Sequence, residues 1–299
     1  MTHPSHRLAP FSDDHHARAT LFRALHDRDT QKNGVFIMPC AWDAASATIF
    51  EEAGFQSIGT TSGGVNWSLA EPDYVYRASR DDMLQAYGRI AKATSLPVSG
   101  DLENGYGDTP EQVAQTILDS IQLGMVGGSI EDQKMQANGA LFDSQLAVER
   151  IQAARQAADE TGLTYTLTAR CEGYRPDDPQ SYHLVVERLN RYREAGADCL
   201  FAPGISDINT LRNLVDDVCG PISFGMGATE KPLSQDMIEQ CGVTRISTGG
   251  GIARAAFSAI RAAALEIKTT GRFGYLDQAI SDSDINHYFN THGQIDRRA

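Results

Sequence analysis

The amino-acid sequence predicts an α/β protein that folds as a (β/α)8 TIM barrel, with one helix before the barrel and a helical extension after it. Two observations support this prediction. Short apolar segments with β-branched residues alternate with helical segments eight times, which is typical of parallel strands joined by crossover helices. Polar and glycine residues also gather just after the strands, where TIM barrels build their sites.

The expected elements follow in chain order, beginning with a helix over Asp13–Asp29 that precedes the barrel. Strands are expected over Val35–Cys40, Ser57–Thr61, Val98–Asp101, Val126–Ile130, Thr164–Ala169, Cys199–Ala202, Ile222–Phe224 and Arg245–Ser247. The helices that follow them are expected over Ala44–Ala53, Arg80–Thr94, Pro110–Leu123, Asp143–Glu160, Pro179–Ala195, Ile208–Val218, Ser234–Gln240 and Ala253–Lys268. A last helix is expected over Ser281–Phe289.

Proline and glycine account for several of these boundaries. Thr109-Pro110 marks a helix start, because proline suits the first helical position. Gly54, Gly162 and Gly196 follow the ends of helical segments, where glycine commonly caps the last turn.

An open, doubly wound sheet is the main alternative to a barrel. It is less favoured because no G-x-G-x-x-G turn follows the first strand. Eight short strands of similar length are instead the number that closes a barrel. No shift in composition and no linker divides the chain. We therefore expect one domain over residues 1–299, with the barrel over about 33–268 and the extension over 269–299.

Charge and cysteine usage restrict the class of protein. The chain has 26 basic and 39 acidic residues, a formal net charge of −13, which argues against nucleic-acid binding. Its five cysteines form no C-x-x-C pair, so reduced thiols are favoured over a disulfide framework or a zinc site. Neither a signal peptide nor an apolar segment long enough for a bilayer is found. We expect a cytoplasmic enzyme.

Three carboxylates follow neighbouring predicted strands and suggest a metal site. Asp101 and Glu103 are two residues apart, a spacing that on a strand directs both side chains the same way. Glu131 ends the next strand. Oxygen ligands of this kind suit Mg²⁺ or Mn²⁺. The alternative is that these acids cap helices or pair with arginines.

Arg170 and a glycine-rich loop are the candidates for substrate binding. The guanidinium of Arg170 follows the fifth strand and could bind a carboxylate or stabilise an oxyanion, or could pair with Glu172 or Glu131. The loop Ser62-Gly63-Gly64 follows the second strand. Its backbone N–H groups could hold a carboxylate, although a tight turn alone also requires glycine.

Two further features carry weaker signals. Thr248-Gly249-Gly250-Gly251 follows the last strand, where many barrels bind phosphate, but glycine also serves such a turn. Cys40 and Cys171 lie beside candidate site positions, yet buried cysteine most often acts as a small apolar residue.

At these positions the sequence resembles the isocitrate lyase/phosphoenolpyruvate mutase superfamily over about Pro39 to Leu265. The matching stretches are Ala41-Trp42-Asp43-Ala44-Ala45-Ser46-Ala47, Glu52-Ala53-Gly54-Phe55, Thr60-Thr61-Ser62-Gly63-Gly64-Val65, Asp101-Leu102-Glu103-Asn104-Gly105-Tyr106-Gly107, Ile130-Glu131-Asp132-Gln133, Thr168-Ala169-Arg170 and Ala195-Gly196-Ala197-Asp198. The resemblance implies a (β/α)8 barrel, a homotetramer built as a dimer of helix-swapped dimers, a bound Mg²⁺ ion and a 2-oxo or 2-hydroxy acid substrate.

The resemblance also implies roles for individual residues. Asp101 is the implied direct metal ligand. Water-mediated contacts to the metal are implied for Glu103, Glu131 and Asp73. The substrate carboxylate is implied to bind Ser62, Gly63 and Gly64. Arg170 is implied to bind the carboxylate or the enolate oxygen.

The sequence departs from the family pattern in two places. Glu103 replaces the more usual aspartate. The loop Lys134–Asp143 contains neither the cysteine nor the histidine of the isocitrate and methylisocitrate lyase loop. Asn138 lies roughly where phosphonate-handling members place an asparagine, but without their surrounding lysines.

These observations favour a Mg²⁺-dependent lyase or decarboxylase of a small 2-oxo or 2-hydroxy mono- or dicarboxylic acid. A metal-stabilised enolate is the expected intermediate, as in an oxaloacetate decarboxylase. One alternative is a phosphonopyruvate hydrolase or a phosphonomutase acting on phosphoenolpyruvate or its carboxy derivative. The other is a family member that binds 2-oxo acids without catalysis. Substrate choice is expected to depend on the 132–142 loop and on Ser223.

Overall fold

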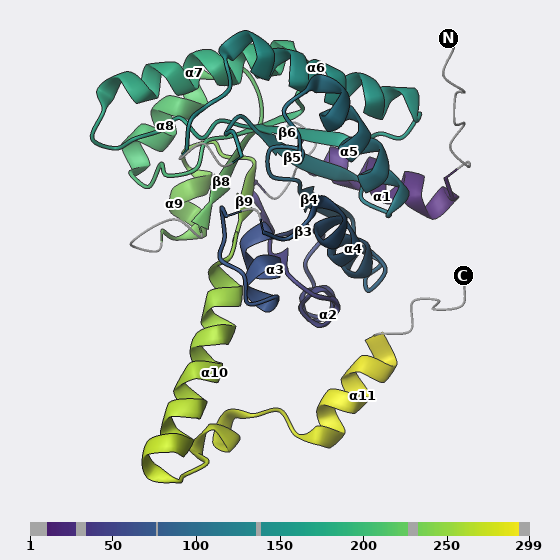
Figure 1. Ribbon diagram of the computed structural model, residues 1–299, viewed down its shortest axis with the longest axis vertical. Coiled ribbons are helices and arrows are strands. Elements are labelled where there is room, and N and C mark those ends of the chain that lie inside the picture. The colour runs from purple at the N-terminus through teal and green to yellow at the C-terminus, as the bar shows by residue number, and fades with distance from the viewer. Residues whose placement is uncertain (1–10, 28–33, 76, 136–138, 227–232, 293–299) are drawn as a thin grey trace.

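The computed structural model describes residues 11–27, 34–75, 77–135, 139–226 and 233–292. Nine parallel strands in these ranges form one sheet in the order β1-β9-β8-β7-β6-β5-β4-β3-β2. The strands are β1 (Phe36–Met38), β2 (Cys40–Ala41), β3 (Ile58–Thr60), β4 (Val98–Asp101), β5 (Gly127–Glu131), β6 (Thr166–Arg170), β7 (Cys199–Phe201), β8 (Ile222–Gly225) and β9 (Arg245–Ser247). Because β1 and β2 are consecutive in the chain, the two ends of the sheet meet in a nearly closed barrel (Figure 1). The predicted fold class is confirmed.

The strand expected over Val35–Cys40 is two strands rather than one. β1 pairs with β9 and β2 pairs with β3. Pro39 lies between them and has no N–H group to donate to a neighbouring strand. Its carbonyl oxygen still accepts a hydrogen bond of 2.8 Å from the Gly59 N–H group. The split therefore changes the number of strands and leaves the barrel topology intact.

Helices surround the sheet, and most lie within a few residues of their expected ranges. They are α1 (Asp13–Ala24), α2 (Ala44–Glu52), α3 (Ser62–Ser68), α4 (Arg80–Ala91), α5 (Pro110–Gln122), α6 (Ser144–Glu160), α7 (Pro179–Glu194), α8 (Ile208–Asp217), α9 (Gln235–Glu239), α10 (Gly251–Thr270) and α11 (Asp282–His292), with a 3₁₀ helix η2 (Gly274–Gln278). Capping explains where helices such as α5 begin. Thr109 and Gln112 form a capping box around Pro110, the first residue of α5.

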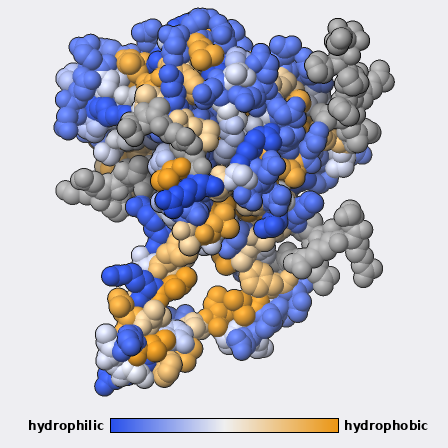
Figure 2. Space-filling view, in the orientation of Figure 1, coloured by the Kyte–Doolittle hydropathy of each residue, from blue (hydrophilic) through white to orange (hydrophobic). Residues whose placement is uncertain are grey.

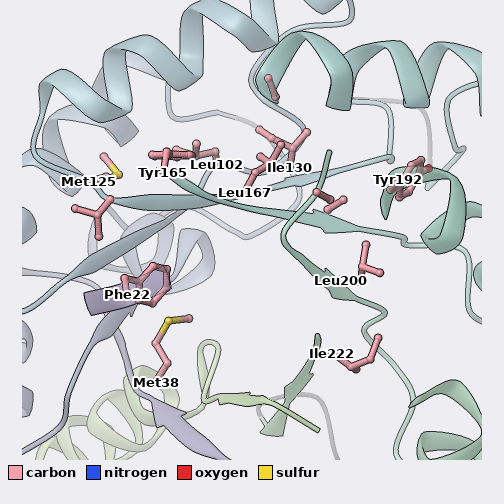
Figure 3. Close-up of a cluster of buried hydrophobic side chains, with 14 of the residues drawn as sticks. Phe22, Met38, Leu102, Met125, Ile130, Tyr165, Leu167, Tyr192, Leu200 and Ile222 are labelled. Carbon is pink, nitrogen blue, oxygen red and sulfur yellow. The ribbon is translucent and has the colours of Figure 1, made fainter. Parts of the chain in front are cut away.

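The hydrophobic core lies between the strands and the helices that cover them (Figure 3). Ile130, Leu167 and Leu200 come from three neighbouring strands and are 1% exposed or less. Phe22 of α1 is fully buried, and α1 packs on β6. Gly127 makes room for this ring, because a Cβ at that position would lie 2.6 Å from Phe22 Cε1.

The C-terminal helices form an arm that leaves the barrel. α10 extends away from it, and the chain then returns through η2 and α11 (Figure 1). Large apolar side chains are exposed along the arm, among them Ile260, Leu265, Phe273, Leu276 and Ile280. Figure 2 shows the corresponding apolar surface below the barrel. In the described ranges, no helix has both the length and the apolar character that crossing a bilayer requires.

Candidate active site

A cavity of about 350 Å³ opens where the barrel strands end. Residues at the C-terminal ends of six strands line it: Thr60, Asp101, Arg170, Phe201, Gly225 and Ser247. Of the residues expected to form the site, Ser62, Gly63, Asp73, Asp101, Arg170 and Ser223 also line this cavity. Gly64, Glu103 and Glu131 lie outside its lining, and Asn138 lies outside the described residues.

Asp101 ends β4 and is held by hydrogen bonds from three sides. Its Oδ2 atom accepts from the Ser62 N–H group at 3.0 Å and from the Ser62 hydroxyl at 2.9 Å. Its own N–H group donates to Thr60 Oγ1 at 2.8 Å, and its carbonyl oxygen accepts from the Tyr87 hydroxyl at 2.7 Å. Ser62 of α3 thus holds the carboxylate, while Thr60 of β3 and Tyr87 of α4 hold the backbone of Asp101.

Glu103 does not continue the strand, so the expected strand geometry was wrong for this residue. β4 ends at Asp101, and Glu103 has a left-handed φ of +49°. The turn is held from outside by Arg150 of α6, whose guanidinium donates to the carbonyl oxygens of Asn104 and Gly107. The Thr116 hydroxyl donates to the Gly105 carbonyl oxygen at 2.8 Å. The turn, rather than strand alternation, therefore sets the direction of the Glu103 side chain.

The acids around Asp101 have raised pKa values. Burial, with the charges of Asp101 and Asp73, raises the pKa of Glu103 to about 8. Burial and the charge of Asp101 also raise the pKa of Asp73. Burial raises the pKa of Glu131, against the opposing effect of Arg170. Burial is the largest cause of each pKa shift, and neighbouring carboxylates add to it in all three acids.

Arg170 is the cation at the centre of this acidic cluster. Its guanidinium lies 3.7 Å from Asp101 Oδ1 and 3.4 Å from Glu131 Oε2, and it pairs most closely with Glu172. Its Nη2 atom donates to the Tyr74 hydroxyl at 3.2 Å. The ion pairs with Glu172 and Glu131, which were the alternative role for Arg170, are therefore present. They coexist with its position in the cavity lining.

Ser62-Gly63-Gly64 forms the first turn of α3, not the loop expected from the sequence. Thr61 caps this helix, and its side chain accepts from the Gly64 N–H group at 3.3 Å. Gly63 faces the cavity, and a Cβ there would lie 2.7 Å from Asp73 Oδ2. A Cβ on Gly64 would instead lie 2.8 Å from Trp42 Cβ. Gly63 thus lies at the site, whereas Gly64 serves packing.

The acidic cluster fits a hard divalent cation held mainly through water. No three His, Cys, Asp or Glu side chains in the described part of the chain converge closely enough to bind one ion directly. Mg²⁺ commonly takes one or two carboxylates and keeps several waters. Asp101 and Asp73 both belong to the cavity lining, whereas Glu103 and Glu131 lie outside it. Asp101, which Ser62 holds in place, could bind such an ion directly, and the other acids could contact its waters.

Packing explains most of the features that gave weaker signals in the sequence, the Thr248–Gly251 turn and the two cysteines. Thr248 Oγ1 accepts from the Cys40 N–H group at 3.0 Å. Gly249 and Gly250 line the cavity, and a Cβ on Gly250 would lie 2.7 Å from the Trp67 ring. Burial raises the pKa of both the Cys40 and Cys171 thiols. Neutral thiols of this kind are poor nucleophiles.

Sequence reasoning missed several residues that line the cavity. Tyr74 follows Asp73, has a left-handed φ of +58° and contacts Arg170 through its hydroxyl. Ser129 and Arg245 lie within predicted strands. For Arg245 a signal was available, because a charged residue in a buried strand demands a partner or a ligand.

Comparison with known proteins shows which family and relatives the sequence matches. Residues 22–268 match the family described as phosphoenolpyruvate phosphomutase. The 2-methylisocitrate lyase of Escherichia coli K12 is 32% identical over 187 residues, which cover 60% of this chain and 61% of the lyase. An uncharacterised Mycobacterium tuberculosis protein, Rv1998c, is 32% identical over 74% of this chain and 80% of its own length.

Solved structures share the fold over nearly the whole chain. A Burkholderia cenocepacia J2315 protein provisionally assigned as a lyase/mutase is 42% identical, with a TM-score of 0.86, covering 93% of this chain and 97% of that one. A 2,3-dimethylmalate lyase is 28% identical, with a TM-score of 0.80 and coverage of 93% and 95%. A phosphonopyruvate hydrolase in complex with oxalate and Mg²⁺, 22% identical with a TM-score of 0.80 and coverage of 92% and 95%, shows the same fold.

Proposed function

Because the chain belongs to the phosphoenolpyruvate mutase/isocitrate lyase superfamily of enzymes, we propose that it is a Mg²⁺-dependent carbon–carbon lyase or decarboxylase. Its substrate is a small 2-oxo or 2-hydroxy acid. The observation that carries the proposal is the arrangement of Asp101 and Arg170 in one cavity lining, with four further carboxylates (Asp73, Glu103, Glu131 and Glu172) around them. The 2-methylisocitrate lyases among its relatives support the carbon–carbon lyase class.

Asp101 would hold the metal directly, and Glu103, Glu131 and Asp73 would hold its waters. A bound Mg²⁺ ion supplies Lewis acidity to the two adjacent oxygens of a 2-oxo acid. Ser62 and Gly63, at the start of α3, lie beside Asp101 and are suited to the substrate carboxylate. Ser62 has already given its N–H group to Asp101, so Gly63 is the better donor of the two.

Arg170 stabilises the charge that develops on the enolate oxygen. Its three acidic neighbours raise its pKa further, so the guanidinium stays charged and its orientation is fixed before substrate binds. In the simplest reaction, oxaloacetate decarboxylation, the bond between C3 and the distal carboxylate breaks. CO₂ leaves, the bonding electrons pass into the enolate, and a proton taken up at C3 yields pyruvate.

The composition of the Lys134–Asp143 segment argues against methylisocitrate cleavage by this chain. The segment contains no cysteine and no histidine, so the acid/base group that the lyase loop supplies is missing. Enolate stabilisation remains possible without it, because decarboxylation of a β-keto acid requires no general base.

A panel of 2-oxo and 2-hydroxy acids of three to six carbons, assayed with Mg²⁺ and with Mn²⁺, tests the proposal. We expect turnover of at least one acid, abolished by EDTA and by Asp101→Ala. Tight oxalate binding with no turnover of any acid would identify a binding protein instead. Metal affinity and activity that survive Asp101→Ala would overturn the site assignment.

Phosphorus–carbon chemistry is the second candidate, and the match to the phosphoenolpyruvate phosphomutase family favours it. Incubation with phosphonopyruvate separates the two. Release of pyruvate and phosphate indicates a hydrolase, and formation of phosphoenolpyruvate indicates a mutase. The lyase proposal predicts neither product.

A further inference from the structure

Arg245 is a buried cation that faces the cavity, and its hydrogen-bond partners among the described residues are uncharged. It lies on β9, is 3% exposed and belongs to the cavity lining. Its Nε atom donates to Ser223 Oγ at 2.9 Å and its Nη2 atom to Thr168 Oγ1 at 3.2 Å. Its Nη1 atom lies 3.2 Å from His26 Nε2. Within the described ranges, its hydrogen bonds lead to no carboxylate.

His26 is neutral and cannot supply the missing negative charge. An arginine always donates, so His26 Nε2 accepts from Arg245 and the proton resides on Nδ1. That atom lies 2.8 Å from the Phe22 carbonyl oxygen and donates to it. Burial and the charge of Arg245 lower the pKa of His26 to about 3. The positive charge of Arg245 is therefore not balanced by the groups that hold it.

Arg170, another arginine of the cavity lining, provides the contrast. Arg170 and Arg245 occupy one register row of the sheet, Arg170–Phe201–Ser223–Arg245, which runs across β6 to β9. Arg170 is surrounded by Asp101, Glu131 and Glu172. Arg245 is held in place by hydroxyl groups and an imidazole, and burying such a charge without a counterion is costly.

We propose that Arg245, oriented by Ser223 and Thr168, binds a second carboxylate of the substrate, which makes this chain selective for dicarboxylic acids. A guanidinium has five N–H donors, and the three contacts of Arg245 leave two for a ligand. The inference rests on the proposed function, in which the first carboxylate lies at Ser62 and Gly63 and the adjacent oxygen lies at Arg170.

The same reasoning selects among reactions. A guanidinium stabilises a carboxylate anion and opposes its conversion into neutral CO₂, since it binds the ground state more tightly than the transition state. The carboxylate at Arg245 is therefore one that the product retains. Within the proposed function, this favours cleavage of a bond that leaves the distal carboxylate on a product over decarboxylation, in which that carboxylate leaves as CO₂.

Calorimetry with three ligands at saturating Mg²⁺ tests the inference. Malate and 2-hydroxybutanoate share the 2-hydroxy acid end and differ in the distal carboxylate, whereas oxalate lacks the distal part. We expect wild-type protein to bind malate about tenfold to 100-fold more tightly than 2-hydroxybutanoate. In Arg245→Met this preference should fall to within about threefold, with oxalate affinity unchanged.

Two further variants control for folding. Arg155→Met removes a half-buried arginine, paired with Asp198 outside the cavity lining, and should lower Tm without changing ligand preference. Arg245→Lys keeps the charge and should keep part of the preference if Arg245→Met fails to fold. Equal binding of malate and 2-hydroxybutanoate by wild type, or full preference in a folded Arg245→Met, would overturn the inference. Failure of oxalate to bind wild type would overturn the proposed function instead, whatever the malate preference.

Discussion

At the scale of single residues, the site depends on how carboxylates are crowded around one arginine. Asp101 and Arg170 could be predicted because both end buried strands, where TIM barrels place functional side chains. The conformation of Glu103 could not be predicted, because a left-handed glutamate has no sequence signature. The uncharged partners that Arg245 has among the described residues could not be predicted either, because they depend on the register of β6, β8 and β9.

The raised pKa of Glu103 predicts how stability depends on pH. The folded protein holds this proton up to about pH 8, whereas the unfolded chain loses it near 4.5. The metal-free protein should therefore become less stable as pH rises from about 4.5 to 8. Thermal unfolding should show this slope in wild type and a weaker one in Glu103→Gln.

Mg²⁺ should oppose that loss of stability, because it binds the folded state with its acids ionised. The rise in Tm on adding Mg²⁺ should be larger at pH 8 than at pH 6. A rise that is equal at the two pH values would argue that Glu103 does not take part in the metal site.

At the scale of elements, α3 is where the structure differs from what the sequence led us to expect. Ser62-Gly63-Gly64 resembles a turn because two glycines in sequence usually mark one. The cap from Thr61 instead begins a short helix there. Most other helix boundaries could be predicted from the sequence, because capping residues such as Thr109 and Gln112 can be recognised in it. The break at Pro39 depends on which neighbours β1 and β2 pair with.

The two glycines of α3 form a matched pair of tests. In Gly63→Ala, the new Cβ would lie 2.7 Å from Asp73 Oδ2 and displace that carboxylate. We expect Mg²⁺-dependent oxalate affinity to fall on the order of tenfold with little change in Tm.

In Gly64→Ala, the Cβ would lie 2.6 Å from Thr61 Cγ2 and 2.8 Å from Trp42 Cβ. This overpacking should lower the free energy of unfolding by about 1–3 kcal/mol. Denaturant unfolding and oxalate calorimetry on both variants would check the separation. Equal losses of affinity and stability in the two would contradict it.

At the scale of the whole molecule, alternation of strands and helices was enough to predict the barrel. The exposed apolar arm of α10, η2 and α11 was not apparent from periodicity, since an amphipathic helix looks the same whether it packs on its own chain or on another. Contiguous apolar surface of this kind marks an interaction site (Figure 2). We propose that the arm joins copies of this chain in a helix-swapped homotetramer.

A charge placed on the arm should disrupt this assembly. Ile260 of α10 is 64% exposed in the single chain, and Ile260→Glu would bury a carboxylate in the proposed interface. Light scattering after size-exclusion chromatography should give a lower mass for this variant. Leu184→Glu, at an exposed apolar position on α7, is the control and should leave the mass unchanged. A wild-type protein that is monomeric would contradict the assembly.

The central claim is that Asp101, aided by the surrounding acids, holds a divalent cation that binds a planar 2-oxo acid together with Arg170. Oxalate mimics the enolate with its two adjacent oxygens, so its binding reports on this site without knowledge of the substrate. The most direct measurement is calorimetric titration of oxalate into wild type and Asp101→Ala, with and without Mg²⁺. We predict binding only in wild type with Mg²⁺ present. Oxalate affinity that is the same without Mg²⁺, or that survives in Asp101→Ala, would contradict the claim.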